Sequence, residues 1–157
     1  MTGIRLLIVD DHPVVRTGLR GMFETDPGFV VVDEAANGAQ AIEQVQATRP
    51  DLVLMDLQMP VLDGVAATAR IRQLPNPPPV LVLTTYDSDN QILRAIEAGA
   101  AGYLLKDTPR ETLFAAVRSA VGLPGTEQLR HVAEVVPSGG RLLRVVRGEP
   151  ARLHREQ

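Results

Sequence analysis

Short, continuously apolar runs recur over the first 121 residues, and segments with helical periodicity separate them. Such runs are typical of strands that are buried on both faces of a parallel sheet. The predicted strands are Ile4–Val9, Phe29–Val32, Leu52–Met55, Val80–Leu83 and, with a weaker pattern, Gly102–Leu105. Because a helical segment follows each of these runs, the sequence predicts an α/β fold with a doubly wound five-stranded parallel sheet.

The segments between the strands place their apolar residues on one helical face. Three sets show this most clearly: Ala41, Ile42, Val45 and Ala47; Ile92, Leu93, Ile96 and Ala100; Leu113, Ala116, Val117 and Val121. Turn-forming residues occupy the connections, among them Asp63-Gly64 and the proline-rich segment 74–79.

The pattern changes after Val121, where the segment 122–125 (GLPG) ends the last helical face. We therefore expect a domain of residues 1–121 and a C-terminal segment of residues 122–157. In that segment, the apolar spacing of Thr126–Val136 predicts one short helix. The run Arg141–Arg147 is too short to assign to a helix or a strand, and no recognition helix for DNA is evident.

Composition narrows the class of protein. The chain of 157 residues is 45% hydrophobic and 22% charged, with a net charge of −3 and no cysteine. This apolar fraction is far above that of disordered chains, and the lack of cysteine excludes disulfides and thiolate metal sites. No apolar run approaches the roughly 18 residues of a membrane span, and no secretory signal is readable. We expect a soluble, cytoplasmic protein.

The basic residues are almost all arginines, and Lys106 is the only lysine among the 16 basic residues. The arginines are expected to lie mainly on the solvated surface. The single lysine follows the last predicted strand, which makes its position informative.

Polar side chains follow four of the five predicted strands. In the strand order 2-1-3-4-5 these strand ends reach one edge of the sheet, where open α/β sheets bind their ligands. The residues concerned are Asp10 and Asp11 after the first strand, Asp56 after the third, Thr84 and Thr85 after the fourth, and Lys106 after the fifth.

Three carboxylates at one edge repel one another unless protons or a cation intervene. A hard divalent cation such as Mg²⁺ resolves this repulsion, because it takes carboxylates, waters and a phosphoryl oxygen as ligands. A carboxylate beside Mg²⁺, a lysine and a hydroxyl is suited to accept a phosphoryl group in line. Each aspartate alone is explained as well by a helix cap or a turn; the set at four strand ends favours the phosphoryl-accepting site.

Other chemistries of α/β folds fit less well. The sequence lacks the glycine-rich dinucleotide motif, the P-loop motif and the serine nucleophile elbow. A phosphatase of the haloacid dehalogenase type also forms a phosphoaspartate, but its two aspartates are separated by one residue after the first strand. Here Asp10 and Asp11 are adjacent and the best nucleophile candidate follows the third strand, so a small-molecule phosphatase is the less favoured alternative.

Four motifs occur in order: residues 6–13 (LLIVDDHP), 50–60 (PDLVLMDLQMP), 80–86 (VLVLTTY) and 98–107 (AGAAGYLLKD). Together with Asp63-Gly64 they resemble the receiver domain of two-component response regulators, in particular the NarL/FixJ (LuxR-type) subfamily. The resemblance covers residues 4–121 and implies the flavodoxin-like receiver fold.

The resemblance also implies roles for named residues. Asp56 would accept a phosphoryl group from a sensor histidine kinase. Asp11, Asp56 and the backbone carbonyl of Gln58 would bind Mg²⁺, and Asp10 would act through a water.

Three further residues follow from the same resemblance. Lys106 would contact the phosphoryl group, and Thr84 would move its hydroxyl to a phosphoryl oxygen. Tyr103 would turn inward behind Thr84 and so change the face formed by the fourth helix, the fifth strand and the fifth helix. Receivers often have a proline after the lysine; because Asp107 stands there instead, no cis peptide bond is expected at this position.

Regulators of this subfamily usually continue into a helix-turn-helix domain, and residues 122–157 do not show its pattern. Two hypotheses stay open. One is a phosphorylation-controlled transcription regulator whose output domain is absent from this chain through truncation or an altered C-terminus. Such a regulator would form dimers on phosphorylation and would contact DNA only through that domain. The other is a stand-alone receiver that acts by protein docking or phosphorelay. Neither is an enzyme beyond its own phosphotransfer and autodephosphorylation.

Overall fold

The computed structural model of the chain describes residues 3–85, 89–122, 143–144 and 152–153. The elements are β1 (Ile4–Val9), α1 (Pro13–Glu24), β2 (Phe29–Ala35), α2 (Gly38–Thr48), β3 (Leu52–Met55), α3 (Gly64–Arg72), β4 (Val80–Thr84), α4 (Asp89–Glu97), β5 (Gly102–Leu105), α5 (Arg110–Ala120), β6 (Leu143–Arg144) and β7 (Arg152–Leu153). The helix predicted at Thr126–Val136 lies outside the described residues. Within Arg141–Arg147, the two described residues form β6, which pairs antiparallel with β7.

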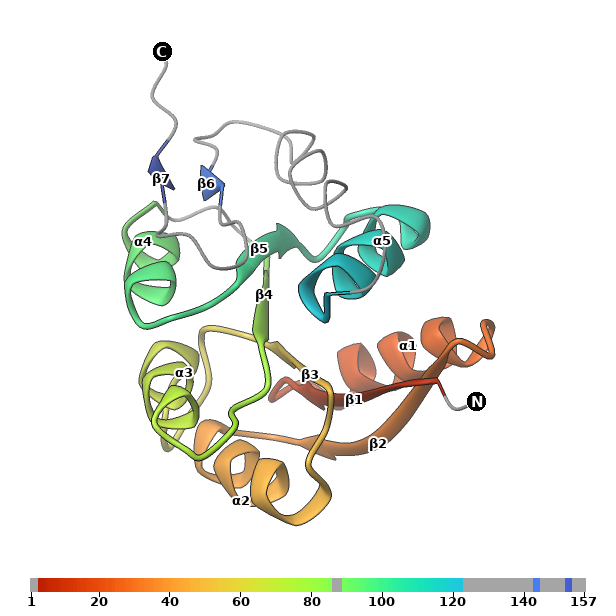
Figure 1. Ribbon diagram of the computed structural model, residues 1–157, viewed down its shortest axis with the longest axis horizontal. Coiled ribbons are helices and arrows are strands. Elements are labelled where there is room, and N and C mark those ends of the chain that lie inside the picture. Colours follow the sequence, from red (N-terminus) through yellow and green to blue (C-terminus); the bar gives the residue numbers. More distant parts are fainter. Residues whose placement is uncertain (1–2, 86–88, 123–142, 145–151, 154–157) are drawn as a thin grey trace.

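Strands β1 to β5 form one parallel sheet with the order β2-β1-β3-β4-β5 (Figure 1). The predicted α/β class, parallel pairing and strand order are confirmed. Because every strand runs in the same direction, the carboxyl ends of all five strands lie at one edge.

Two apolar clusters cover the sheet, and the larger one includes residues of both faces at β4 and β5, where the neighbours Val82 and Leu83 both belong to it. In β1, successive side chains point to opposite faces, so Leu6 and Ile8 join the larger cluster and Leu7 and Val9 join the other. Helices α1 and α5 lie on the first face and α2 and α3 on the second (Figure 1), while apolar residues of α4 also join the larger cluster. Both faces being covered explains why the strand sequences are continuously apolar.

The observed elements differ from the predicted ones at several ends: β4 includes Thr84, and α5 ends at Ala120, before Val121. Strand β2 runs on to Ala35, beyond the predicted end at Val32, because the polar residues Asp33 and Glu34 continue an edge strand whose outer side is half-buried. Helix α4 ends at Glu97, so Ala100 does not belong to its apolar face. Gly99 has a φ of 112°, which ends the helix and leads into β5.

Helix α3 begins in close contact with the end of β3. A Cβ atom on Gly64 would collide with the backbone oxygen of Asp56 and would lie 2.8 Å from the Cα of Leu57. The side chain of Asp63 caps the helix by accepting a hydrogen bond of 2.8 Å from the Ala66 N–H. The Asp63-Gly64 pair therefore fixes the loop that carries Asp56 and Gln58.

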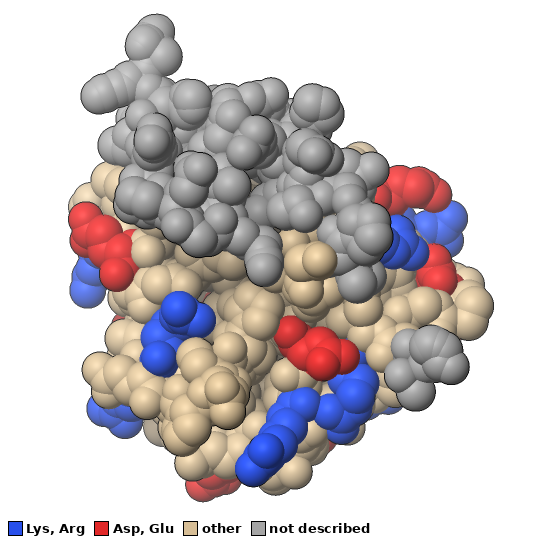
Figure 2. Space-filling model, viewed as in Figure 1, with Lys and Arg blue, Asp and Glu red and all other residues tan. Residues whose placement is uncertain are grey.

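Charged side chains are dispersed over the surface. On the face shown in Figure 2, blue and red side chains alternate, and the described residues form no continuous patch of one sign. This agrees with the expectation that the arginines are solvated surface residues. Among the helices that the structure describes, none combines the length and the apolar character that a membrane span requires.

Candidate functional site

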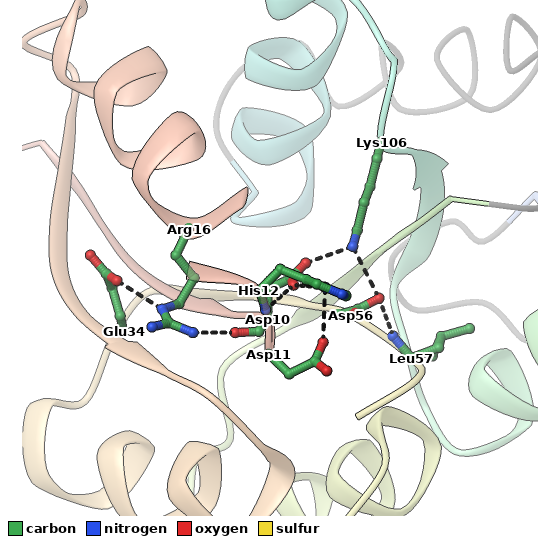
Figure 3. A network of polar contacts seen from close by, with 8 residues as sticks. All are labelled: Asp10, Asp11, His12, Arg16, Glu34, Asp56, Leu57 and Lys106. Atoms are coloured by element: carbon green, nitrogen blue, oxygen red, sulfur yellow. Dashed lines mark hydrogen bonds and ion pairs between the residues drawn. The ribbon is translucent and has the colours of Figure 1, made fainter. Parts of the chain in front are cut away.

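Three side chains from three strand ends meet at the carboxyl edge of the sheet. The Lys106 Nζ lies 2.6 Å from Asp10 Oδ2 and 3.4 Å from Asp56 Oδ1 (Figure 3). Asp10 follows β1, Asp56 follows β3 and Lys106 follows β5. The structure thus brings together the two carboxylates and the ammonium that the sequence predicted at this edge.

The backbone hydrogen bonds between neighbouring strands continue into Asp56 and Lys106 and fix the backbone of both residues. The Asp56 N–H donates to the carbonyl oxygen of Val9 at 3.0 Å, and the Lys106 N–H donates to that of Thr84 at 2.8 Å. The Leu57 N–H donates to Asp56 Oδ1 at 2.9 Å. The Asp56 and Lys106 side chains therefore project from backbone that hydrogen bonds to a neighbouring strand hold in place.

Asp11 completes the acidic cluster, and His12 joins it. Asp10, Asp11, His12 and Asp56 each offer one atom, and these atoms lie within 4.8 Å of one another. The Oδ1 of Asp11 is buried and accepts no hydrogen bond in the described structure, although His12 Nδ1 is 3.1 Å away. A cation held by this cluster would satisfy the oxygen.

Burial dominates the electrostatics of Asp56. Its side chain is almost inaccessible to water, and this desolvation is the largest cause of a pKa raised to about 6. The negative charge of Asp10 contributes to the increase, and the positive charge of Lys106 offsets only part of it. For Lys106, burial alone would lower the pKa, but the hydrogen bond to Asp10 and the charges of Asp56 and Asp10 outweigh burial and raise it.

The residues with expected switch roles are buried close to the cluster. Thr84 ends β4 with 8% of its surface exposed, and Tyr103 lies in β5 with 5% exposed. Tyr103 belongs to the larger apolar cluster and lies on the same face of the sheet as its register partner Val82 and as Met55, which pairs with Val82. Thr85 and Gln58 are exposed. No cis peptide bond occurs among the described residues, which includes the bond between Lys106 and Asp107.

A network on the β2 side of the cluster was not predicted from the sequence. Arg16 donates from Nη1 to the backbone oxygen of Asp10 at 2.7 Å and from Nε to Glu34 Oε1 at 3.0 Å (Figure 3). Arg20 donates from Nε to Glu34 Oε2 at 2.6 Å. These hydrogen bonds, that of Arg20 foremost, lower the pKa of the Glu34 carboxyl. The role of Glu34 was missed in the sequence because the predicted second strand ended at Val32, two residues before it.

The arrangement suits one kind of chemistry. Clustered carboxylate oxygens match the ligands of a hard divalent cation. A carboxylate with an ammonium beside it is placed to receive a phosphoryl group, whose oxygens the ammonium and the cation would neutralise.

Comparisons with known proteins agree with this geometry. The family model described as response regulator receiver domain matches residues 6–118. The chain is 44% identical over 117 residues, 74% of its length, to the transcriptional regulatory protein YdfI of Bacillus subtilis, and covers 54% of that relative. It is 39% identical over 118 residues, 75% of its length, to the nitrate/nitrite response regulator protein NarP of Escherichia coli, and covers 55% of it.

A solved structure gives the same result for the fold. The crystal structure of a two-component response regulator of the LuxR family from Aurantimonas sp. aligns with a TM-score of 0.72 at 35% identity. The alignment covers 85% of this chain and 98% of that one. The chain spans about half the length of the curated relatives named above.

Proposed function

The chain belongs to the family of response regulator receiver domains of two-component systems, and from this premise we propose that Asp56 accepts a phosphoryl group from a sensor histidine kinase. The meeting of Lys106 Nζ with the Asp10 and Asp56 carboxylates carries this proposal. The ammonium of Lys106 lies 3.4 Å from Asp56 Oδ1, so it adjoins this carboxylate and is placed to pair with the oxygens of a phosphoryl group bonded to it.

The donor set fits Mg²⁺. Asp11 and Asp56 would bind the ion directly with the backbone carbonyl of Gln58, and Asp10 would act through a water. The buried Asp11 Oδ1, which accepts no hydrogen bond within the described structure, supports this assignment. When bound, Mg²⁺ supplies the positive charge that offsets the phosphoryl oxygens.

The protein's own groups carry the transfer. A carboxylate oxygen of Asp56 forms a bond to phosphorus while the bond from phosphorus to the donor histidine nitrogen of the kinase breaks. Lys106 stays protonated, since its neighbouring carboxylates raise its pKa, and its ammonium pairs with a phosphoryl oxygen. The only chemistry assigned to the chain is this self-catalysed phosphotransfer and the later hydrolysis of the phosphoaspartate, which restores the Asp56 carboxylate and releases inorganic phosphate.

The response is a change at one face of the domain. Phosphorylation adds negative charge and acceptor oxygens at Asp56, and these give the Thr84 hydroxyl a partner that exists only in the phosphorylated state. Movement of Thr84 alters the space next to Tyr103 and with it the face formed by α4, β5 and α5. The burial of Thr84 and Tyr103 near the cluster supports this coupling.

The output of the whole protein follows from its relatives. YdfI is named a transcriptional regulatory protein, so we assign control of transcription, with dimerisation on phosphorylation, as the purpose of the switch. Residues 1–121 form the receiver and residues 122–157 a separate C-terminal segment. The end of α5 at Ala120 and the family match over residues 6–118 support this division.

Labelling by a small phosphodonor tests the proposal. The wild-type chain is incubated with acetyl phosphate and Mg²⁺, and the mass gain of one phosphoryl group is followed by intact mass spectrometry. Asp56→Asn should lose the label and keep the fold. Asp51→Asn is the matched control, because Asp51 lies just before β3, at the end of that strand opposite to Asp56. Its carboxylate accepts a hydrogen bond from the backbone N–H of Arg5. The Asp51→Asn variant should gain the phosphoryl label to the same extent as wild type.

Two results would contradict the proposal. Full labelling of Asp56→Asn would mean that another group accepts the phosphoryl. Continuous turnover of a small phosphate ester by the wild-type chain would favour an aspartate-based phosphatase instead.

A further inference from the structure

Arg16 links three elements of the molecule next to the acidic cluster. It lies in the first turn of α1, and its side chain is only 18% exposed. One side of its guanidinium meets Glu34 in β2, and the other meets the backbone oxygen of Asp10, where β1 ends. In Figure 3 the guanidinium lies between the Glu34 carboxylate and this oxygen.

The contact with Asp10 fixes a peptide group that the cluster depends on. The Asp10 N–H donates to the Ala35 oxygen at 3.0 Å, and its carbonyl accepts from Arg16 at 2.7 Å. The carbonyl of Asp10 and the N–H of Asp11 belong to the same planar peptide unit. Holding that carbonyl therefore restricts the backbone from which the Asp11 carboxylate projects.

Glu34 determines where the guanidinium lies. Its two oxygens are shared, with Oε1 accepting from Arg16 and Oε2 from Arg20. The planar guanidinium presents donors in fixed directions, so a pairing on one edge aims the remaining N–H groups at Asp10. The charge of Glu34 also offsets part of the positive charge that Arg16 and Arg20 bring to this region.

We propose that Arg16, held by Glu34, is a positioning residue that orients Asp11 for the divalent cation through the backbone carbonyl of Asp10. This inference rests on the proposed function, since it concerns the same Mg²⁺ site. Arg16 touches neither the ion nor the phosphoryl group in this account.

Two effects of removing Arg16 oppose each other. Loss of a positive charge near the cluster would strengthen cation binding, whereas loss of the hydrogen bond to Asp10 would weaken it. Because Glu34 already offsets part of this charge, we expect the second effect to dominate. Residues that orient metal ligands change metal affinity by roughly 10- to 100-fold, and Arg16→Met should weaken Mg²⁺ binding by about tenfold.

The test is a titration of the full 157-residue chain with Mg²⁺ alone, followed by the amide chemical shifts of Asp11 and Leu57 in ¹⁵N-labelled protein. Arg20→Met is the matched control, because Arg20 shares Glu34 and carries the same charge but makes no contact with Asp10. It should bind Mg²⁺ as wild type does. Arg16→Lys keeps the charge and loses the fork of donors, and it should weaken binding in the same direction as Arg16→Met but less.

A second readout separates positioning from catalysis. With Mg²⁺ raised to saturation for each variant, Arg16→Met should recover the wild-type rate of phosphorylation by acetyl phosphate, because Asp56 and Lys106 are untouched. The amide spectra report folding in the same samples. If Arg16→Met does not fold, the Mg²⁺ affinity of Arg16→Lys is compared with that of wild type instead.

The outcomes distinguish this inference from the proposed function. If the wild-type chain shows no Mg²⁺-dependent shifts at Asp11 and Leu57, the metal site itself is wrong. If the wild type binds Mg²⁺ and the folded Arg16 variants bind it equally well, or if Arg20→Met weakens binding as much as Arg16→Met, the positioning role of Arg16 is overturned.

Discussion

The interior of the sheet and its carboxyl edge bury different kinds of side chain, and the change occurs between two consecutive residues. Met55 is fully buried among apolar side chains, and Asp56, the next residue, is buried as a carboxylate. Val9 and Asp10 repeat the same step at the end of β1. The two regions share one backbone ladder, yet burial stabilises the fold in one and opposes it in the other.

Magnitudes show how large the contrast is. Burial of a Leu-sized or Met-sized side chain contributes roughly 1.5–3 kcal/mol to stability. Raising the pKa of Asp56 from 3.8 to about 6 means that its ionised form costs about 3 kcal/mol at neutral pH. The free-energy cost of ionising this one carboxylate at the edge is thus about as large as the stabilisation from burying one core side chain. The interior carries the stability that permits a site built from repelling groups.

The largest predicted effect lies in the interior. Phe23 is fully buried against Phe29 and Phe114, whose ring centroids lie 5.0 and 5.1 Å from its own. Phe23→Ala should lower the free energy of unfolding by about 3–5 kcal/mol, through lost burial and the cavity left behind. Urea denaturation measures it. Val14→Ala on the same helix is the control, because Val14 is 82% exposed and should change stability by less than about 0.5 kcal/mol.

At the edge, a substitution should act in the opposite direction. The folded pKa of Asp56 lies above its unfolded value, so the folded protein without Mg²⁺ holds this proton more tightly than the unfolded chain. The resulting stability is fully present below pH about 4 and is lost as pH rises through about 6. Asp56→Asn cannot ionise, and without Mg²⁺ it should be more stable than wild type at pH 7 by up to about 3 kcal/mol.

The pH dependence is the control for that prediction. Urea denaturation at pH 4 in the presence of a chelator should give wild type and Asp56→Asn nearly equal stability, because Asp56 is then protonated in the folded protein and only about half ionised in the unfolded chain. Equal stability at pH 7, or a less stable Asn variant there, would mean that burial of this carboxylate is not costly.

The smallest predicted effect concerns the loop between β3 and α3. Val61 has a φ of 70°, and the Leu62 N–H donates to the Pro60 oxygen across it at 2.7 Å. This is a γ-turn with positive φ, a rare and strained form, and a β-branched residue adds to the strain. Val61 is 79% exposed, so Val61→Gly loses little burial and should raise stability by about 1 kcal/mol. Thermal unfolding at neutral pH would detect it; a lower midpoint would show that the strain is not relieved.

Sequence patterns predicted the interior better than the edge. Continuous apolar runs located all five strands because both faces of a parallel sheet are covered, and polar residues after those runs located Asp10, Asp11, Asp56 and Lys106. The extension of β2 to Ala35 was missed because an edge strand tolerates polar residues, which break the apolar pattern. The contact of Arg16 with Asp10 was missed for a different reason: it joins a helix to a backbone carbonyl, and a carbonyl has no signature in sequence.

Chemical trapping of the phosphorylated wild-type chain would identify the phosphoacceptor residue by its position in the sequence. Borohydride reduces an aspartyl phosphate to homoserine, so peptide mass spectrometry after treatment with acetyl phosphate and Mg²⁺ identifies the modified position. We predict homoserine at position 56 and unmodified aspartate at positions 10 and 11. Homoserine at either of those positions, or at none of the three, would contradict the account.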